Sequence, residues 1–162
     1  MNVQEISEKD WREKLVVNII EPISQLPLLI TDVERFLGIK FKRYWEDGLG
    51  EFAGIAIAID DFDLVIKGPL DKEMGASIYV RGNEPQPKLL LQHVCKVLNI
   101  EYRNLKWISD IVDGERFVVS RLDDNSNEID MDVFLTERGA KSYAKEYESR
   151  GHKQIYSVRK AT

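Results

Sequence analysis

FAGIAIAIDDFDLVIKG, residues 52–68, is the stretch of sequence that decides the fold. It contains two short runs of apolar and β-branched residues, which are typical of β-strands. Asp60 and Asp61 separate the two runs. Aspartate is frequent in turns because its side chain bonds to the local backbone. The stretch therefore predicts a β-hairpin that ends at Gly68 and Pro69.

Two more predicted strands flank this hairpin. Residues 39–45, IKFKRYW, alternate in polarity, with Ile39 and Phe41 on one face. Residues 76–82, ASIYVRG, form a further short run that closes at Gly82. Because the strands follow one another with short turns, the sequence predicts an antiparallel meander of about four strands.

Two helices are expected to cover this sheet. In TDVERFLG, residues 31–38, Thr31 and Glu34 have the spacing of a capping box, and Gly38 provides a C-terminal stop. Residues 85–100 begin with two prolines and then place apolar residues at helical spacing. The members of this apolar stripe are Leu91, Val94, Cys95 and Leu98.

The first thirty residues leave two alternatives open. A helix can begin at about Asp10, with Trp11 and Leu15 on one side. LVVNII, residues 15–20, is equally compatible with a strand because it is rich in β-branched residues. Pro22 and Pro27 would interrupt either element.

A second unit is predicted from Gly114 onward. Residues 115–122 and 128–135 have the composition of strands, and residues 136–151 that of a helix which Thr136 caps and Gly151 stops. A last strand follows at residues 153–160. We therefore predict an α+β protein with two domains. Residues 1–112 would form an antiparallel sheet covered by helices, and residues 113–162 a ββαβ module packed on it.

The turn between the first two strands of this module resembles the start of a calcium loop, since Asp123, Asn125 and Asn127 occupy alternate positions. A calcium loop needs glycine at its sixth position and glutamate at its twelfth. Here Glu128 and Phe134 stand at those positions, so we predict a hairpin turn and no metal site. In the following strand, three acidic residues are expected to face solvent and three apolar residues to face the core. They are Glu128, Asp130 and Asp132, and Ile129, Met131 and Val133, respectively.

Composition limits the classes of function. The chain has 162 residues, a net charge of −5 and one cysteine, so an internal disulfide is impossible. The sequence contains neither a signal peptide pattern nor an apolar run long enough to cross a membrane, and we expect a cytoplasmic protein that binds no membrane. Since neither half of the chain is basic, we also expect no nucleic acid partner.

Catalytic motifs are scarce. Zinc ligands would have to come from His93, Cys95 and His152, and the first two point to different sides of a predicted helix. Cys95 belongs to an apolar stripe and is expected to be buried instead of nucleophilic. There is no phosphate-binding glycine loop and no serine-nucleophile motif. We predict no enzyme activity, metal or cofactor. The alternative left open is a carboxylate-based, metal-dependent hydrolase that uses Asp60, Asp61 and Asp63.

Two resemblances bear on function. GERFVVSRLDDNSN, residues 114–127, and GHKQIYSV, residues 151–158, resemble small bacterial ββαβ modules of unassigned role. The chain as a whole resembles the immunity proteins that bacteria pair with polymorphic or contact-dependent toxins, which are small acidic α+β domains. That resemblance implies a non-enzymatic inhibitor, or antitoxin, that neutralises a cognate toxin by covering its active site.

On this hypothesis an acidic surface with aromatic anchors binds a basic toxin domain, because opposite charge speeds association and aromatic residues dominate interfaces. The candidate partner-binding residues are Tyr44, Trp45, Glu46, Asp47, Asp60, Asp61, Asp63, Asp123, Asp124, Asp130 and Asp132. A regulatory module that binds protein or RNA is a further alternative, since residues 41–45, FKRYW, interleave aromatic and basic side chains. The oligomeric state does not follow from the sequence.

Overall fold

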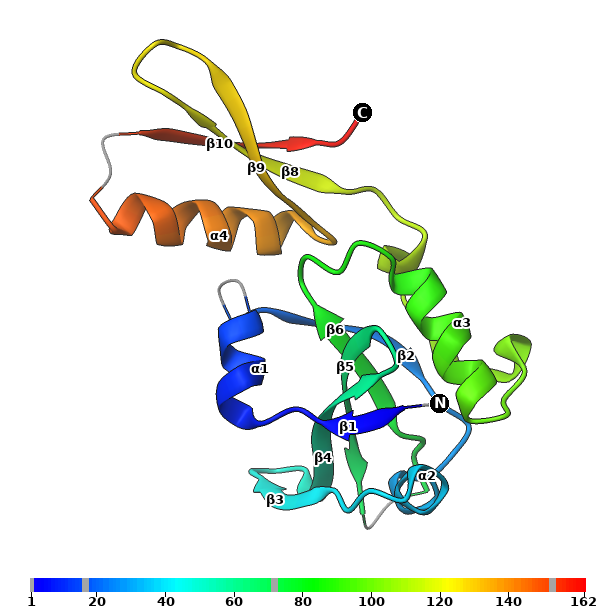
Figure 1. Ribbon diagram of the computed structural model, residues 1–162. Coiled ribbons are helices and arrows are strands. Elements are labelled where there is room, and N and C mark those ends of the chain that lie inside the picture. Colours follow the sequence, from blue (N-terminus) through cyan, green and yellow to red (C-terminus); the bar gives the residue numbers. More distant parts are fainter. Residues whose placement is uncertain (1, 16–17, 71–72, 152–153) are drawn as a thin grey trace. The chain divides into compact units, whose positions relative to one another are not determined.

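A computed structural model describes residues 2–15, 18–70, 73–151 and 154–162 (Figure 1). The described residues form four α-helices and ten β-strands with antiparallel pairing, so the chain has the predicted α+β fold. The chain divides into two compact units. The first unit contains residues 1–14, 22–80 and 86–109, and the second contains residues 15–21, 81–85 and 110–162. The segments 15–21 and 81–85 thus belong with the C-terminal unit, whereas the sequence assigns them to the N-terminal domain.

The larger sheet has the strand order β1-β4-β5-β6-β2-β7, with β3 also paired to β4. The predicted meander is confirmed, because β3, β4, β5 and β6 follow one another in antiparallel register. The strands of this sheet are β1 (Val3–Glu5), β2 (Ile20–Gln25), β3 (Lys42–Glu46), β4 (Gly50–Ile59), β5 (Phe62–Pro69), β6 (Ser77–Arg81) and β7 (Trp107–Ile108).

Alternation along β4 and β5 determines which face of this sheet is buried. Ile55, Ile57 and Ile59 of β4 lie in the core, and β5 adds Leu64 and Ile66 to the same face. Burying an isoleucine side chain completely contributes about 1.5–3 kcal/mol, so this face accounts for much of the stability of the first unit. The intervening residues, among them Phe52 and Lys67, lie on the opposite face.

Three helices belong to the first unit, namely α1 (Glu8–Lys14), α2 (Ile30–Leu37) and α3 (Pro87–Val97). The apolar stripe predicted for α3 is buried, and Gly38 ends α2 in the left-handed conformation with φ of 69°, as predicted. The predicted capping box is wrong. Leu29 precedes α2 without a side-chain cap, and Glu34 instead accepts hydrogen bonds from the residues that lead into β3.

Of the two alternatives that the sequence left open, the structure has a helix that includes Trp11, whereas the described residues 15, 18 and 19 of LVVNII lie outside any strand. Helix α1 ends at Lys14 and strand β2 begins at Ile20, while residues 16 and 17 lie outside the described residues. Pro22 lies within β2 and is exposed. The short strand β1, which the sequence did not indicate, pairs with the end of β4. No helix among the described residues is long and apolar enough to span a membrane.

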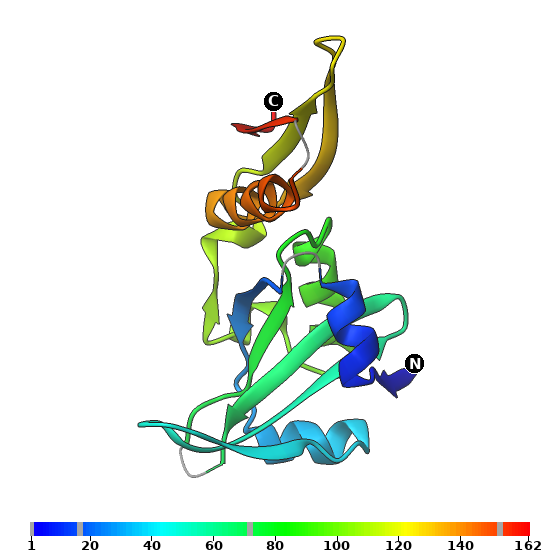
Figure 2. The same cartoon turned by 90° about the vertical axis from the view of Figure 1, so that its left-hand side faces the viewer.

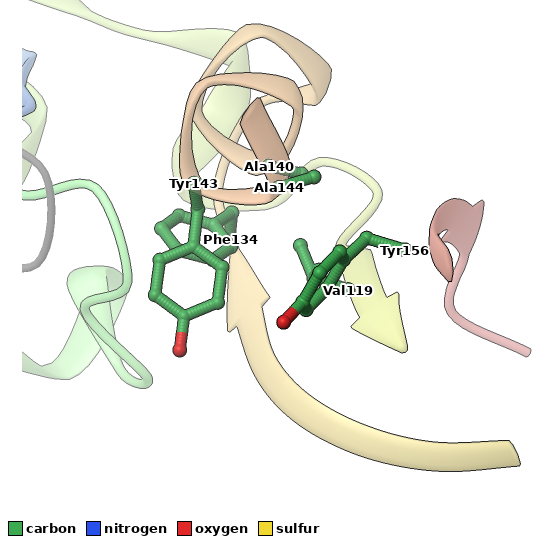
Figure 3. Packing of buried hydrophobic residues seen from close by; sticks show 6 residues of the cluster. All are labelled: Val119, Phe134, Ala140, Tyr143, Ala144 and Tyr156. Atoms are coloured by element: carbon green, nitrogen blue, oxygen red, sulfur yellow. The ribbon is translucent and has the colours of Figure 1, made fainter. Parts of the chain in front are cut away.

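The second unit has the predicted ββαβ order: β8 (Phe117–Leu122), β9 (Glu128–Phe134), α4 (Glu137–Ser149) and β10 (Ile155–Lys160). Its three strands have the order β10-β8-β9 and are antiparallel. Thr136 caps α4 as predicted, since its Oγ1 accepts the Gly139 N–H at 3.0 Å. The core of this unit, drawn in Figure 3, contains Val119, Phe134, Ala140, Tyr143, Ala144 and Tyr156.

The predicted alternation of β9 is only partly right. A register shift between Val119 and Ser120 opposes them to Asp132 and Asp130, so Met131 is an extra residue on β9. Residues directly opposite in an antiparallel pair share a face. Asp132 therefore lies on the same face as Val119, which is buried under α4, and not on the solvent face. Met131 packs against this core as predicted, whereas Ile129 and Val133, which were also predicted to face it, are exposed.

Candidate functional site

The hairpin of β3 and β4 carries Trp45, the most exposed large apolar side chain among the described residues of the first unit. Its pairing runs from Lys42 opposite Gly54 to Glu46 opposite Gly50, and Gly48 and Gly50 adopt positive φ angles at the turn. Figure 2 shows this hairpin, in cyan, extending beyond the neighbouring strands of its sheet. Among the described strands β3 pairs only with β4, so its other edge is open.

Trp45 is the outstanding residue of this hairpin, because 70% of its surface is exposed. Leu49, in the turn, is 50% exposed, and Tyr44, which precedes Trp45 in β3, is 36% exposed. Tryptophan buries a large apolar area when it meets a partner and is strongly enriched among residues that dominate binding energy. An exposed tryptophan on a regular strand, beside an exposed leucine, is therefore typical of a protein interface.

Glu34 holds the strand that carries Trp45. Its carboxylate accepts the Phe41 N–H at 2.6 Å and both terminal nitrogens of Arg43 at 2.7 Å. The hydrogen bond from Arg43, followed by that from Phe41, keeps the pKa of Glu34 below its usual value. These contacts tie α2 to the start of β3.

The opposite face of the hairpin continues onto the sheet as an aromatic surface around Lys67. The rings of Tyr44 and Phe52 lie 6.0 Å apart, and the Lys67 ammonium lies 4.9 Å from the centre of the Tyr79 ring. The same ammonium is 3.3 Å from the Glu46 carboxylate. Burial is the largest cause that raises the pKa of Tyr44, to about 12, so its hydroxyl stays protonated at neutral pH.

Two small cavities open on this face, and both are lined in part by Lys67. The first, of about 260 Å³, has Gly54 and Ala56 as its floor and Trp11 and Tyr44 among its walls. A side chain at position 54 would narrow it, because a Cβ atom there would lie 3.0 Å from that of Lys67. The second, of about 250 Å³, is lined by residues that include Leu49, Phe52, Met74 and Tyr79. Both are smaller than the roughly 300–1,000 Å³ of drug-sized ligand sites and suit single side chains of a partner.

The acidic residues proposed from the sequence do not form one surface. Glu46 and Asp47 lie before β4, whereas Asp60, Asp61 and Asp63 follow it. A ten-residue strand separates the two groups, a length of roughly 30 Å at the rise of an extended chain. Tyr44 and Trp45 adjoin only the first group.

The group at the β4–β5 turn is engaged in contacts within the first unit. Asp60 accepts the Asn2 N–H at 2.7 Å and lies 2.8 Å from Nε2 of His93, and the first of these contacts is the largest cause of its lowered pKa. Asp63 is paired with Lys14 at 2.7 Å. Asp61 forms no side-chain bond to another described residue. None of the three lines either of the two cavities around Lys67.

The second acidic group lies in the second unit and is also engaged. Asp123 accepts the N–H groups of Asn125 and Asn127 at 2.9 and 2.8 Å, as expected for a hairpin turn, and its contacts with Asn127 lower its pKa. The other members of the group are engaged as follows. Asp130 is bonded to Ser120 and Arg159, and Asp132 accepts from Asn83 at 3.0 Å, whereas Asp124 has no such bond within the described chain.

Cys95 and His93 lie on α3 but do not form a shared site. Cys95 is buried, and burial raises the pKa of its thiol, whereas His93 is turned toward Asp60. His152 lies outside the described residues. In the described part of the chain, no three histidine, cysteine, aspartate or glutamate side chains lie close enough together to hold a metal ion.

Sequence reasoning missed four residues of the candidate site: Leu49, Phe52, Lys67 and Tyr79. Alternation along β4 and β5 could have indicated two of them, because Phe52 and Lys67 are next to the buried residues Ala53 and Ile66 and therefore point to the opposite face. Comparisons of the chain with models of protein families, with curated proteins and with solved structures found no match.

Proposed function

We propose that this chain is a non-enzymatic inhibitor that acts by binding another protein through the hairpin surface. We define this surface as the open edge of β3 with Trp45 on one face of the hairpin, Tyr44 and Phe52 on the other, and Leu49 in the turn. The observation that carries the proposal is Trp45, a tryptophan with 70% of its surface exposed on a strand that Glu34 fixes in place. Exposing such a side chain to water is unfavourable, and binding removes that cost.

The proposed partner is a bacterial toxin domain, so that the chain serves as an immunity protein or antitoxin. Trp45 would enter a pocket at the rim of the toxin's active site, while Asp47 and Glu51 at the same end of the hairpin would meet basic residues there. Most other candidate acids already have intramolecular partners. This favours a binding surface made of an apolar anchor with a narrow acidic rim, and not a broad acidic face. The net charge of −5 still favours encounter with a basic protein.

The contacts of Asp60 and Asp63 support binding over the hydrolase alternative. Each carboxylate is held by a neighbour, His93 or Lys14, and neither faces one of the cavities around Lys67. A general acid or base has to reach the proton it transfers within hydrogen-bond distance. The contacts at the β4–β5 turn therefore connect the β4–β5 hairpin to β1, α1 and α3.

The test is affinity purification of the protein, tagged at its own locus, at low salt, followed by mass spectrometry. We expect one stoichiometric partner that is toxic when produced alone and harmless when co-produced with this chain. The association rate should fall as salt rises, because the acidic rim contributes to the encounter. Recovery of the chain alone, or a partner whose toxicity the chain does not relieve, would contradict the inhibitor function.

RNA binding is the second candidate, because β3 is an exposed strand that carries Lys42, Arg43, Tyr44 and Trp45. Both cations are already paired, with Glu5 at 3.5 Å and with Glu34 at 2.7 Å, which leaves little positive charge for phosphates. Fluorescence anisotropy with a labelled single-stranded RNA separates the two functions. We expect no salt-dependent binding, and salt-dependent binding that is lost on Trp45→Ala would favour RNA.

A further inference from the structure

Strand β3 presents an unshielded edge. It makes five consecutive pairs with β4 without a bulge, and among the described strands nothing pairs with its other side. Lys42, Arg43, Tyr44 and Trp45 are all exposed. Alternate backbone N–H and C=O groups of such a strand point outward and form a template for a further strand.

The sequence of this edge is complementary to itself when read in the opposite direction. β3 reads KRYWE, residues 42–46, with a cation at the start, an aromatic residue in the middle and an anion at the end. In an antiparallel pair of two copies centred on Tyr44, Lys42 of one copy lies opposite Glu46 of the other. Arg43 then lies opposite Trp45, which suits a cation–π contact.

We propose that β3 binds β3 of a second copy of this chain in this antiparallel register, forming a dimer with twofold symmetry. Opposite charges directly across an antiparallel pair are stabilising and like charges are destabilising. A parallel pair in register would place Lys42 beside Lys42 and Glu46 beside Glu46, so charge selects the antiparallel form. The twofold axis repeats each favourable pair twice.

The side chains that the dimer needs are accessible. The side chain of Lys42 is 64% exposed and its present contact with Glu5, at 3.5 Å, is a loose surface pair. Glu46 is partly exposed and contacts Lys67 at 3.3 Å, and 70% of the surface of Trp45 is exposed. Because a five-residue strand buries less area than a standard stable interface, the dimer should be weak and reversible.

The dimer does not depend on the proposed inhibitor function, but it uses the same edge. A second copy would cover the open edge of β3 while the protein is alone, and a protein partner that docks on Trp45 would have to displace it. Free protein and partner-bound protein should therefore differ in stoichiometry, with one copy of this chain in the complex.

Sedimentation equilibrium of the purified full chain, over a wide range of concentrations, tests the proposal. We expect a monomer–dimer equilibrium that Lys42→Glu and Glu46→Lys each weaken by about tenfold or more, since each creates two like-charge pairs. An equimolar mixture of the two variants should recover the wild-type affinity, because each anion then meets a cation again. Lys40→Glu changes the net charge by as much as Lys42→Glu does, but Lys40 lies outside β3. This control variant should leave the monomer–dimer equilibrium unchanged.

Circular dichroism melts establish that each variant is folded before it is compared. A protein that stays monomeric at every concentration would overturn the proposal. So would a dimer that neither charge reversal weakens, or one that the mixture of variants fails to restore, because only antiparallel pairing of β3 with itself predicts that restoration.

Discussion

Glu34 shows at the scale of a single residue how a local sequence rule is overridden. Its spacing from Thr31 fits a capping box, yet its carboxylate turns away from the start of α2. A capping box offers this side chain one backbone N–H, whereas Arg43 and Phe41 together offer two charged hydrogen bonds and one backbone bond. Charge-assisted hydrogen bonds are roughly twice as strong as neutral ones, so Glu34 binds Arg43 and Phe41 instead of capping α2.

Replacing Glu34 with glutamine should lower the free energy of unfolding by about 1–2 kcal/mol at neutral pH, because the charge-assisted bonds to Arg43 are lost. The pKa of Glu34 is lowered on folding, so its contribution is present above the ordinary value of 4.5 and is lost as pH falls through the lowered value. Urea unfolding of both proteins from neutral to acidic pH measures this. The difference should shrink at low pH.

The matched control for this prediction is Asp32→Asn on the same helix. Asp32 forms an exposed pair with Arg35 at 3.4 Å, and such surface pairs contribute little. We expect a change of less than about 0.5 kcal/mol. Equal effects of the two substitutions, or a Glu34→Gln effect that does not depend on pH, would show that Glu34 does not tie α2 to β3.

At the scale of elements, the junction of β9 and α4 is the best-defined boundary of the second unit. Thr136 accepts the Gly139 N–H at 3.0 Å and donates its own hydroxyl to Glu21 at 2.8 Å. Glu21 is only 4% exposed, so this hydroxyl satisfies both a helix end and a buried carboxylate. The cap was evident from the sequence, but its second role was not, because Glu21 is remote along the chain.

Thr136→Ala should therefore destabilise the protein by more than an ordinary cap replacement. Loss of a cap costs about 0.5–2 kcal/mol, and a buried carboxylate that loses a donor adds to that cost. Thr136→Ser keeps the hydroxyl and should cost much less. Thermal and urea unfolding of the two variants provide the comparison. If Thr136→Ser and Thr136→Ala lower the free energy of unfolding by the same amount, the hydroxyl does not stabilise this junction.

At the scale of the whole molecule, hydrophobic alternation and turn residues predict the fold well. The isoleucines of β4, the Asp60–Asp61 turn and the Thr136 cap each restrict the backbone locally, and all agree with the α+β class. The sequence predictions fail where contacts between residues that are distant along the chain determine the local structure. The extra residue Met131, which turns Asp132 toward the core face, has no local mark in the sequence.

The candidate site was only partly predictable from the sequence. Tyr44 and Trp45 were identified because aromatic residues dominate interfaces, and the structure exposes both. The acidic residues were all assigned from the sequence to one candidate surface. In the structure, Glu46 and Asp47 precede β4 and Asp60 follows it, so the length of the strand separates them. Which carboxylates are already paired depends on neighbours such as His93, which no sequence pattern connects to them.

The most direct test of the central claim compares two exposed tryptophans of the first unit, Trp45 on β3 and Trp107 on β7, which is 46% exposed. Each is replaced by alanine in the full chain, and the affinity for the co-purified partner is measured by titration calorimetry. We predict that Trp45→Ala weakens binding by about thirtyfold or more, as expected for a dominant interface residue, and that Trp107→Ala changes it by less than about twofold. Unchanged affinity on Trp45→Ala would contradict the assignment of the β3–β4 hairpin as the binding surface.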